Sequence, residues 1–123
     1  MSNKKLIRKQ FRETVFNRDG YRCRKCGMAG KDRQGGDGWK KFHKQMPAID
    51  LDSHHIQDRT LFENQGYTEK NGISVCETCH LKAEEYHQTG GKTVEPGFHP
   101  DELYELIGSS YEEAVLADAK LTS

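Results

Sequence analysis

The sequence lacks any long apolar run. No segment of about 18 residues is apolar enough to cross a membrane as a helix. The first residues, MSNKKLIRKQF, are basic but lack the apolar region and the small-residue cleavage site of a secretory signal. These absences predict a cytoplasmic protein. In a reducing cytoplasm, paired cysteines bind metal more often than they form disulfides.

Apolar residues are also scarce overall. Of the 123 residues, 33% are hydrophobic and 31% are charged. We expect a chain of this length to form one domain over residues 1–123. Its small apolar core needs support from disulfides or a bound metal, and four cysteines are available for that purpose.

The chain has no net charge, but its charges are unevenly distributed. Residues 1–40 carry twelve Lys or Arg and four Asp or Glu, a net charge of +8. Residues 41–123 carry seven bases and fifteen acids, a net charge of −8. This asymmetry favours contact between one face and a polyanion. Alternatively, the basic and acidic segments pair with each other within the fold.

An N-terminal helix is predicted over residues 4–18. Ile7, Phe11 and Val15 recur every four residues and form one apolar stripe. Gly20 then ends the helix.

The middle of the chain predicts two short strands followed by a helix. Residues 48–56 alternate apolar and polar side chains, and residues 73–76 form a short apolar run. Residues 77–89 are expected to form a helix, which Gly90 and Gly91 end. Residues 28–47 are rich in glycine and charge and are expected to be a loop.

Two further helices are expected in a C-terminal extension over residues 91–123. Pro100 suits the first turn of one helix. Ser110 and Glu113 have the spacing of a capping box for another, which ends near Lys120. The predicted fold class is therefore a small α+β domain.

The four cysteines form two pairs with identical spacing, Cys23-x-x-Cys26 and Cys76-x-x-Cys79. A tetrahedral zinc ion binds four thiolates at about 2.3 Å, and a two-residue spacer lets one tight turn offer two of them. The 49 residues between the pairs exceed the spacing of a compact zinc ribbon, which predicts a structured insert. Two disulfides are the alternative to this structural zinc.

Two adjacent histidines, His54 and His55, lie in the segment DSHHIQDR. Neighbouring side chains of a strand point to opposite faces, so the two imidazoles are expected to have separate roles. Asn71 and His80 follow, between and after the zinc-ligand pairs.

The segments RDGYRCRKCG, SHHI, NGISVC and CETCH together resemble the HNH endonucleases in which two Cys-x-x-Cys knuckles bracket a ββα-metal motif. The resemblance lies in the order and spacing of these segments and covers about residues 12–90. It implies that His54 binds a divalent cation and that His55 is the general base. It also implies that Asn71 orients the base and pins the loop, and that His80 is a second metal ligand.

A third metal ligand is where the chain departs from the family. Members usually carry a histidine four residues after the position of His80, whereas this chain has Glu84. One helical turn separates the two, about 6 Å of rise on one face, so both can bind one ion. A carboxylate ligand favours Mg²⁺ or Mn²⁺. His87 is the alternative ligand, but about 10.5 Å of rise separates it from His80.

The activity that the resemblance implies is metal-dependent hydrolysis of DNA phosphodiester bonds, with Mg²⁺, Mn²⁺ or another transition metal as cofactor. A neutral imidazole can accept a proton from water at cellular pH, and a divalent cation neutralises charge that develops on phosphate. The small size favours an enzyme of a phage or mobile element. The alternatives are a zinc-stabilised DNA-binding module without catalysis and a nuclease that acts on RNA.

Each candidate residue also has a structural interpretation. His55 can be a strand histidine that bonds a carbonyl, and Asn71 a turn residue. His80 can be an additional zinc ligand, and Glu84 a solvated acid. Several bases of the N-terminal segment are expected to contact DNA phosphates. These bases are Arg8, Arg12, Arg18, Arg22, Arg24 and Lys25.

Overall fold

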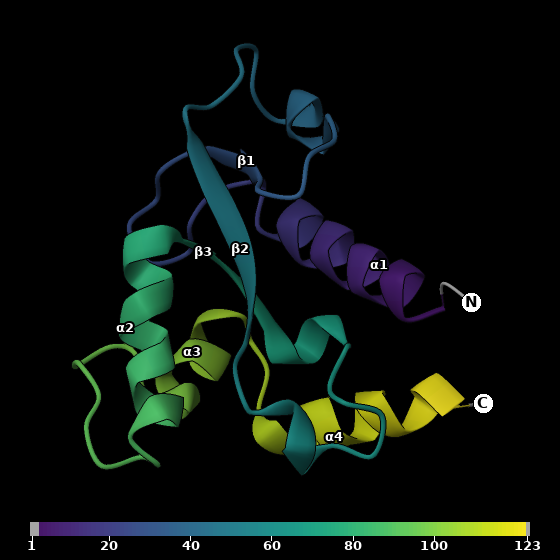
Figure 1. Ribbon diagram of the computed structural model, residues 1–123, viewed down its shortest axis with the longest axis vertical. Helices are drawn as coiled ribbons and strands as arrows, with labels where there is room; N and C mark the ends of the chain where they lie inside the picture. Colours follow the sequence, from purple (N-terminus) through teal and green to yellow (C-terminus); the bar gives the residue numbers. More distant parts are fainter. Residues whose placement is uncertain (1–2, 123) are drawn as a thin grey trace.

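The computed structural model describes residues 3–122, and these form an α+β fold with a three-stranded sheet and four α-helices (Figure 1). Residues 1–2 and 123, which the predicted domain includes, lie outside the described part. The elements in chain order are α1 (Asn3–Arg18), β1 (Gly30–Asp32), β2 (Ile49–His55), β3 (Gly72–Cys76), α2 (Glu77–Gln88), α3 (Pro100–Leu106) and α4 (Tyr111–Ala119). None of the described helices is long and apolar enough to span a bilayer.

The sheet has the order β1-β2-β3, with β2 in the centre. β2 runs parallel to β1 and antiparallel to β3. Its last residue, His55, lies opposite Gly72, and Leu51 lies opposite Cys76. The strand with the two histidines is therefore held on both edges, while the end of β3 leads directly into α2.

The expectation that residues 28–47 are only a loop is wrong. Residues Gly30–Asp32 form β1, and a short 3₁₀-helix over Gly38–Lys41 buries Trp39. A three-residue strand has no apolar alternation that a sequence pattern can detect. Pairing with β2 forms it instead, helped by an ion pair between Lys31 and Asp50 on the two strands.

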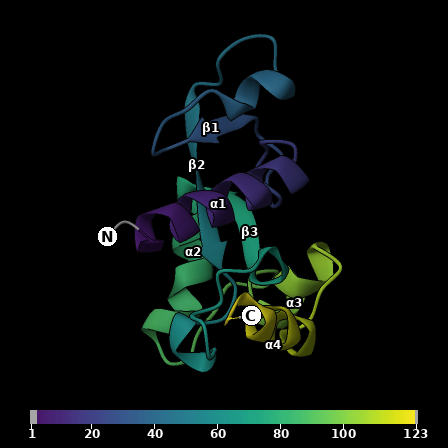
Figure 2. The same cartoon turned by 90° about the vertical axis from the view of Figure 1, so that its right-hand side faces the viewer.

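Helices α1 and α2 cover opposite faces of the sheet. Figure 2 shows α1 in front of β2 and β3, with α2 behind them. Phe11 and Val15 of the predicted stripe are buried, and so is the neighbouring Phe16, whereas Ile7 of the stripe is 42% exposed. On the other side, Ala83 of α2 is buried in the core.

The C-terminal helices brace the segment between β2 and β3. The Tyr104 hydroxyl of α3 donates to Oδ1 of Asn71 at 2.6 Å. Asp118 of α4 is 1% exposed, and its carboxylate accepts hydrogen bonds from the backbone N–H groups of Asn64 and Gly66, both at 2.8 Å. The extension therefore fixes the loop that joins β2 to β3.

Candidate functional site

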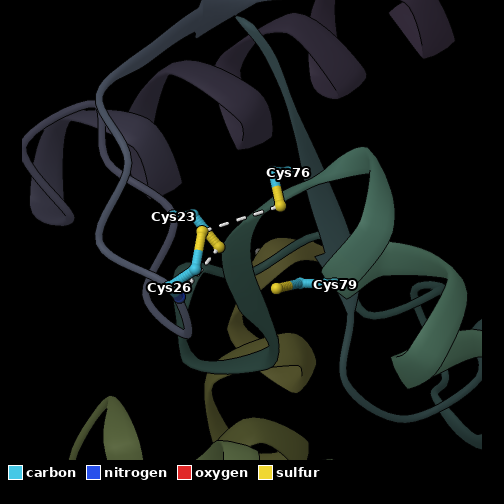
Figure 3. Close-up of side chains that lie close together, drawn as sticks. All are labelled: Cys23, Cys26, Cys76 and Cys79. Atoms are coloured by element: carbon cyan, nitrogen blue, oxygen red, sulfur yellow. Dashed lines mark hydrogen bonds between the residues drawn. The ribbon is translucent and has the colours of Figure 1, made fainter.

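The four cysteines come together, as their spacing predicts. Cys23 and Cys26 lie in the turn after α1, Cys76 ends β3, and Cys79 lies in the first turn of α2. Figure 3 shows their sulfur atoms turned toward one another. All four sulfurs lie within 4.8 Å of one another. None of the four forms a disulfide, so the disulfide alternative finds no support.

The geometry of this cluster fits a tetrahedral zinc ion. Four sulfurs at about 2.3 Å from one ion lie about 3.8 Å apart. The sulfurs of Cys26 and Cys76 are separated by 3.8 Å. The cluster can therefore bind a structural zinc ion that ties the turn after α1 to the β3–α2 junction.

Electrostatics in the cluster also favour a cation. Burial disfavours the thiolate of Cys23, but backbone N–H groups of Cys26 and Cys76 lower its pKa to about 7. Burial and the neighbouring sulfurs of Cys76 and Cys23 raise the pKa of Cys79 far above its usual range. Four thiolates repel one another unless a cation lies between them, and a bound metal deprotonates the thiols that ligate it.

A second group of potential metal ligands lies between β2 and α2. Nδ1 of His54 is 3.2 Å from Oε2 of Glu84, and Nε2 of His80 is 3.3 Å from the same oxygen. All three donor atoms lie within 4.8 Å of one another. Two ligands that bind one ion at about 2.1 Å are about 3.0–3.4 Å apart, so these separations suit a shared divalent cation.

His54 is the buried member of this group. Its side chain is 1% exposed, and neither ring nitrogen has a partner in hydrogen-bond geometry among residues 3–122, although Nδ1 is within ion-pair distance of Glu84. Burial lowers the pKa of His54, which keeps the imidazole in the neutral form that binds metals. A buried polar side chain without such a bond is unusual.

Asp52 orients the second histidine of the group. Its Oδ2 lies 3.2 Å from Nδ1 of His80, which leaves Nε2 of that ring directed toward Glu84. Arg33 holds Asp52 in turn, with Nε donating to Oδ1 at 2.8 Å. Burial alone would favour protonation, but His80 and Arg33 keep the pKa of Asp52 well below its usual range.

His80 and Glu84 of this group favour opposite charges. Burial disfavours the charged ring of His80, but hydrogen bonds with Asp52 and Glu84 raise its pKa to about 9. The imidazoles of His54 and His80 beside it hold the pKa of Glu84 well below its usual range. Metal binding would therefore displace a proton from His80.

His87 lies outside the group. Its Nε2 donates to the backbone carbonyl of Ile56 at 3.1 Å, and its ring centre is 5.6 Å from that of His54. The helix α2 is continuous over Glu77–Gln88, so the rise between His80 and His87 is not shortened by a break. Among the described residues, Glu84 rather than His87 completes the cluster.

His55 lies on the opposite face of β2, against α1. Its ring centre is 4.6 Å from that of Phe11 and 4.9 Å from that of Tyr67. Burial lowers its pKa to about 4, helped by the positive charge of Arg59. Its Nε2 is buried and has no hydrogen-bond partner within residues 3–122. The strand pleat thus separates the two adjacent imidazoles, as expected.

Asn71 is fully buried and holds the chain just after His55. Its Oδ1 accepts from the backbone N–H of Gln57 at 3.0 Å, and its Nδ2 donates to the carbonyls of Gln57 and Gly66. The backbone N–H of Ile56 also donates to its carbonyl, at 2.9 Å. Asn71 therefore pins the loop, and among the described residues its side chain bonds Gln57, Gly66 and Tyr104 rather than His55.

Most of the bases predicted to contact DNA also have partners inside the protein. Arg12 pairs with Asp32 at 3.0 Å, while Arg18 and Arg24 converge on the buried Asp19 at 2.8 and 3.0 Å. Two others donate to backbone carbonyls, Arg22 to Gly27 and Lys25 to Gly97. Ion pairs also cross between the two segments, Arg18 with Glu69 and Lys31 with Asp50, so the alternative that basic and acidic segments pair within the fold describes part of the charge asymmetry.

Arg8 differs from these bases because its partner is the hydroxyl of a tyrosine side chain. Its Nε donates to the Tyr67 hydroxyl at 3.2 Å, and Arg59 donates to the same oxygen at 3.0 Å. Sequence reasoning missed Asp52, Arg59 and Tyr67. The sequence could have indicated Asp52, because it lies two residues before His54 and therefore on the same face of the strand.

Comparisons with protein-family models, curated proteins and solved structures find no match to this chain.

Proposed function

We propose that the protein is a metal-dependent endonuclease of the HNH type that hydrolyses phosphodiester bonds of DNA. The observation that carries the proposal is the convergence of His54, His80 and Glu84 on one face of β2, with His55 next in sequence on the other face. A ligand cluster and a neutral imidazole at the same strand end are the two components that water-mediated phosphodiester hydrolysis requires.

His54, His80 and Glu84 would hold a divalent cation, with two nitrogen donors and one carboxylate oxygen. When bound, such an ion supplies Lewis-acid stabilisation of charge on the phosphate and the leaving oxygen. Three protein ligands leave coordination positions open for substrate and water. The carboxylate of Glu84 favours Mg²⁺ or Mn²⁺ over zinc at this site.

His55 would act as the general base. Its low pKa keeps the imidazole neutral at cellular pH, so Nε2 can accept a proton from the attacking water. Nε2 is buried, and Phe11 and Tyr67 pack against the ring. Substrate binding would therefore require these two side chains to move and expose Nε2. Asn71 supports the base by fixing the backbone that follows it.

A zinc ion bound by Cys23, Cys26, Cys76 and Cys79 would have a structural role. Four thiolate ligands complete its coordination and leave no position for substrate. This ion would position the N-terminus of α2, from which His80 projects one residue after Cys79. The structural site and the catalytic site are therefore adjacent along the chain but differ in ligand type.

The direct test incubates the protein with supercoiled plasmid and, separately, with RNA, either with Mg²⁺ or Mn²⁺ or with the chelator EDTA in place of the ion. We expect plasmid nicking or linearisation that depends on the added ion. Circular dichroism in the same buffers is the control, because a chelator can also remove zinc from the cysteines. Metal-dependent cleavage of RNA alone would change the substrate class.

Binding of DNA without any cleavage would instead support the zinc-stabilised DNA-binding module. In that case His55→Ala would leave all measured properties unchanged.

A further inference from the structure

The surface beside His55 contains two arginines that converge on one phenol. Arg8 comes from α1, and Arg59 comes from the short 3₁₀-helix after β2. Their guanidinium groups donate to the hydroxyl of Tyr67 at 3.2 and 3.0 Å. Segments far apart in sequence thus direct two positive charges at one point.

Neither guanidinium group is neutralised by a carboxylate within ion-pair distance in the described part of the chain. The nearest acid in sequence to Arg59, Asp58, instead caps its own 3₁₀-helix by accepting from the backbone N–H of Thr60 at 3.1 Å. By contrast, Arg12 and Arg33 each pair with an aspartate. Two close cations with no counter-charge form a site that favours an anion.

The position of this pair relates it to the candidate base. The ring of Tyr67 packs edge-on against His55, with ring centres 4.9 Å apart. The positive field reaches both rings: burial opposes ionisation of Tyr67, yet Arg8 and Arg59 lower its pKa. An anion held by the two arginines would therefore lie beside His55.

We propose that Arg8, Arg59 and the Tyr67 hydroxyl form a subsite for a backbone phosphate of the nucleic-acid substrate. Two planar guanidinium groups can each donate two hydrogen bonds to phosphate oxygens, and the hydroxyl can donate a further one. The assignment of the phosphate to a nucleic-acid backbone depends on the proposed nuclease function. The subsite would orient the strand so that its neighbouring phosphate meets His55 and the ligand cluster.

A hollow next to this subsite provides room for the strand. It runs between α1 and the loop after β2, and its lining includes Arg8, Phe11 and Tyr67. Glu63 and Glu69 also line it, and the further basic or uncharged polar residues there are Lys4, Gln10, Thr14, Asn64, Gln65 and Thr68. Polar side chains of this kind make the sequence-independent sugar and phosphate contacts of DNA-binding proteins.

The first experiment titrates inorganic phosphate into the full-length protein without added divalent cation, followed by NMR signals of the Tyr67 and His55 rings. We expect saturable shifts, and at least about tenfold weaker binding in Arg8→Ala and in Arg59→Ala. Lys9→Ala is the matched control, because Lys9 is an exposed base on the same helix. Wild-type shifts that stay unchanged in both arginine variants would overturn the subsite.

The second experiment measures plasmid cleavage by the same variants. We expect kcat/KM to fall about tenfold or more in each arginine-to-alanine variant. Arg59→Lys should recover part of this loss, because lysine keeps the positive charge but lacks the paired N–H donors of the guanidinium group. Cleavage at the wild-type rate in the Arg8→Ala/Arg59→Ala double variant would contradict the proposal while leaving the nuclease function intact.

The nuclease function can also fail while the phosphate subsite is supported. Phosphate binding that depends on both arginines, in a protein that cuts neither plasmid nor RNA, would support the anion subsite and contradict the nuclease function.

Discussion

Oδ2 of Asp52 lies 3.2 Å from Nδ1 of His80, and this contact decides which nitrogen of the imidazole is directed toward the ligand cluster. Carboxylates that accept the second N–H of a metal-binding histidine fix its tautomer and increase its basicity. Asp52 is therefore a positioning residue for the proposed catalytic metal.

Asp52→Asn should weaken Mn²⁺ binding by about 10- to 100-fold while leaving the zinc content unchanged. Isothermal titration calorimetry with Mn²⁺ measures this effect. Asp50→Asn is the matched control, because Asp50 lies on the same strand and near Arg33 but is not bonded to His80. Equal losses in both variants would mean that Arg33, and not His80, transmits the effect.

Glu84→Ala should weaken Mn²⁺ binding more than His87→Ala does. Glu84 is within 3.3 Å of both proposed histidine ligands, whereas His87 bonds the carbonyl of Ile56. Titration of cleavage activity and of calorimetric binding against Mn²⁺ compares the two variants. A larger shift in His87→Ala would assign the third ligand to His87 and require α2 to rearrange.

His55→Ala should reduce cleavage by about 10²- to 10⁴-fold, the usual contribution of a general base. Zinc content and DNA binding should stay close to wild type, because His55 makes ring contacts but no hydrogen bond through Nε2. His54→Ala should instead raise the metal concentration needed for cleavage. A His55→Ala variant that cuts at the wild-type rate would show that another group takes the proton.

Cys26→Ser should release the zinc and unfold the domain, because the free energy of metal binding is coupled to folding. Metal analysis by mass spectrometry and far-ultraviolet circular dichroism measure the two effects. Met28→Ser is the control, since Met28 is 52% exposed in the same turn and its side chain is not a ligand. A folded, zinc-free Cys26→Ser protein would contradict the structural role.

Gly72→Ala should reduce the free energy of unfolding by about 1–3 kcal/mol, the usual effect of overpacking. An added Cβ would lie 2.6 Å from Cγ2 of Val15 and 2.7 Å from Cζ of Phe11. Urea unfolding measures the change. In a double-mutant cycle with Val15→Ala, the two effects should be less than additive, because one variant makes space for the other. Full additivity would place the clash elsewhere.

The sequence alone determined the elements whose signals are local. Apolar residues at helical spacing predicted α1, and alternation predicted β2, because the periodicity of a buried face is set by backbone geometry. The two Cys-x-x-Cys pairs predicted that four sulfurs meet, and the separation of 3.8 Å between Cys26 and Cys76 agrees. The spacing of His80 and Glu84 likewise placed both side chains on one helix face.

Only the tertiary structure decided the contacts between segments that carry no shared local pattern. β1 forms because it pairs with the edge of β2. Three residues are too few for a periodic pattern to predict this strand from the sequence. The charge of Arg18 faces Asp19 in the fold, whereas that of Arg8 meets a phenol that Arg59 also contacts. Net charge counts such residues equally, but their availability to a ligand depends on which side chains the folded chain brings beside them.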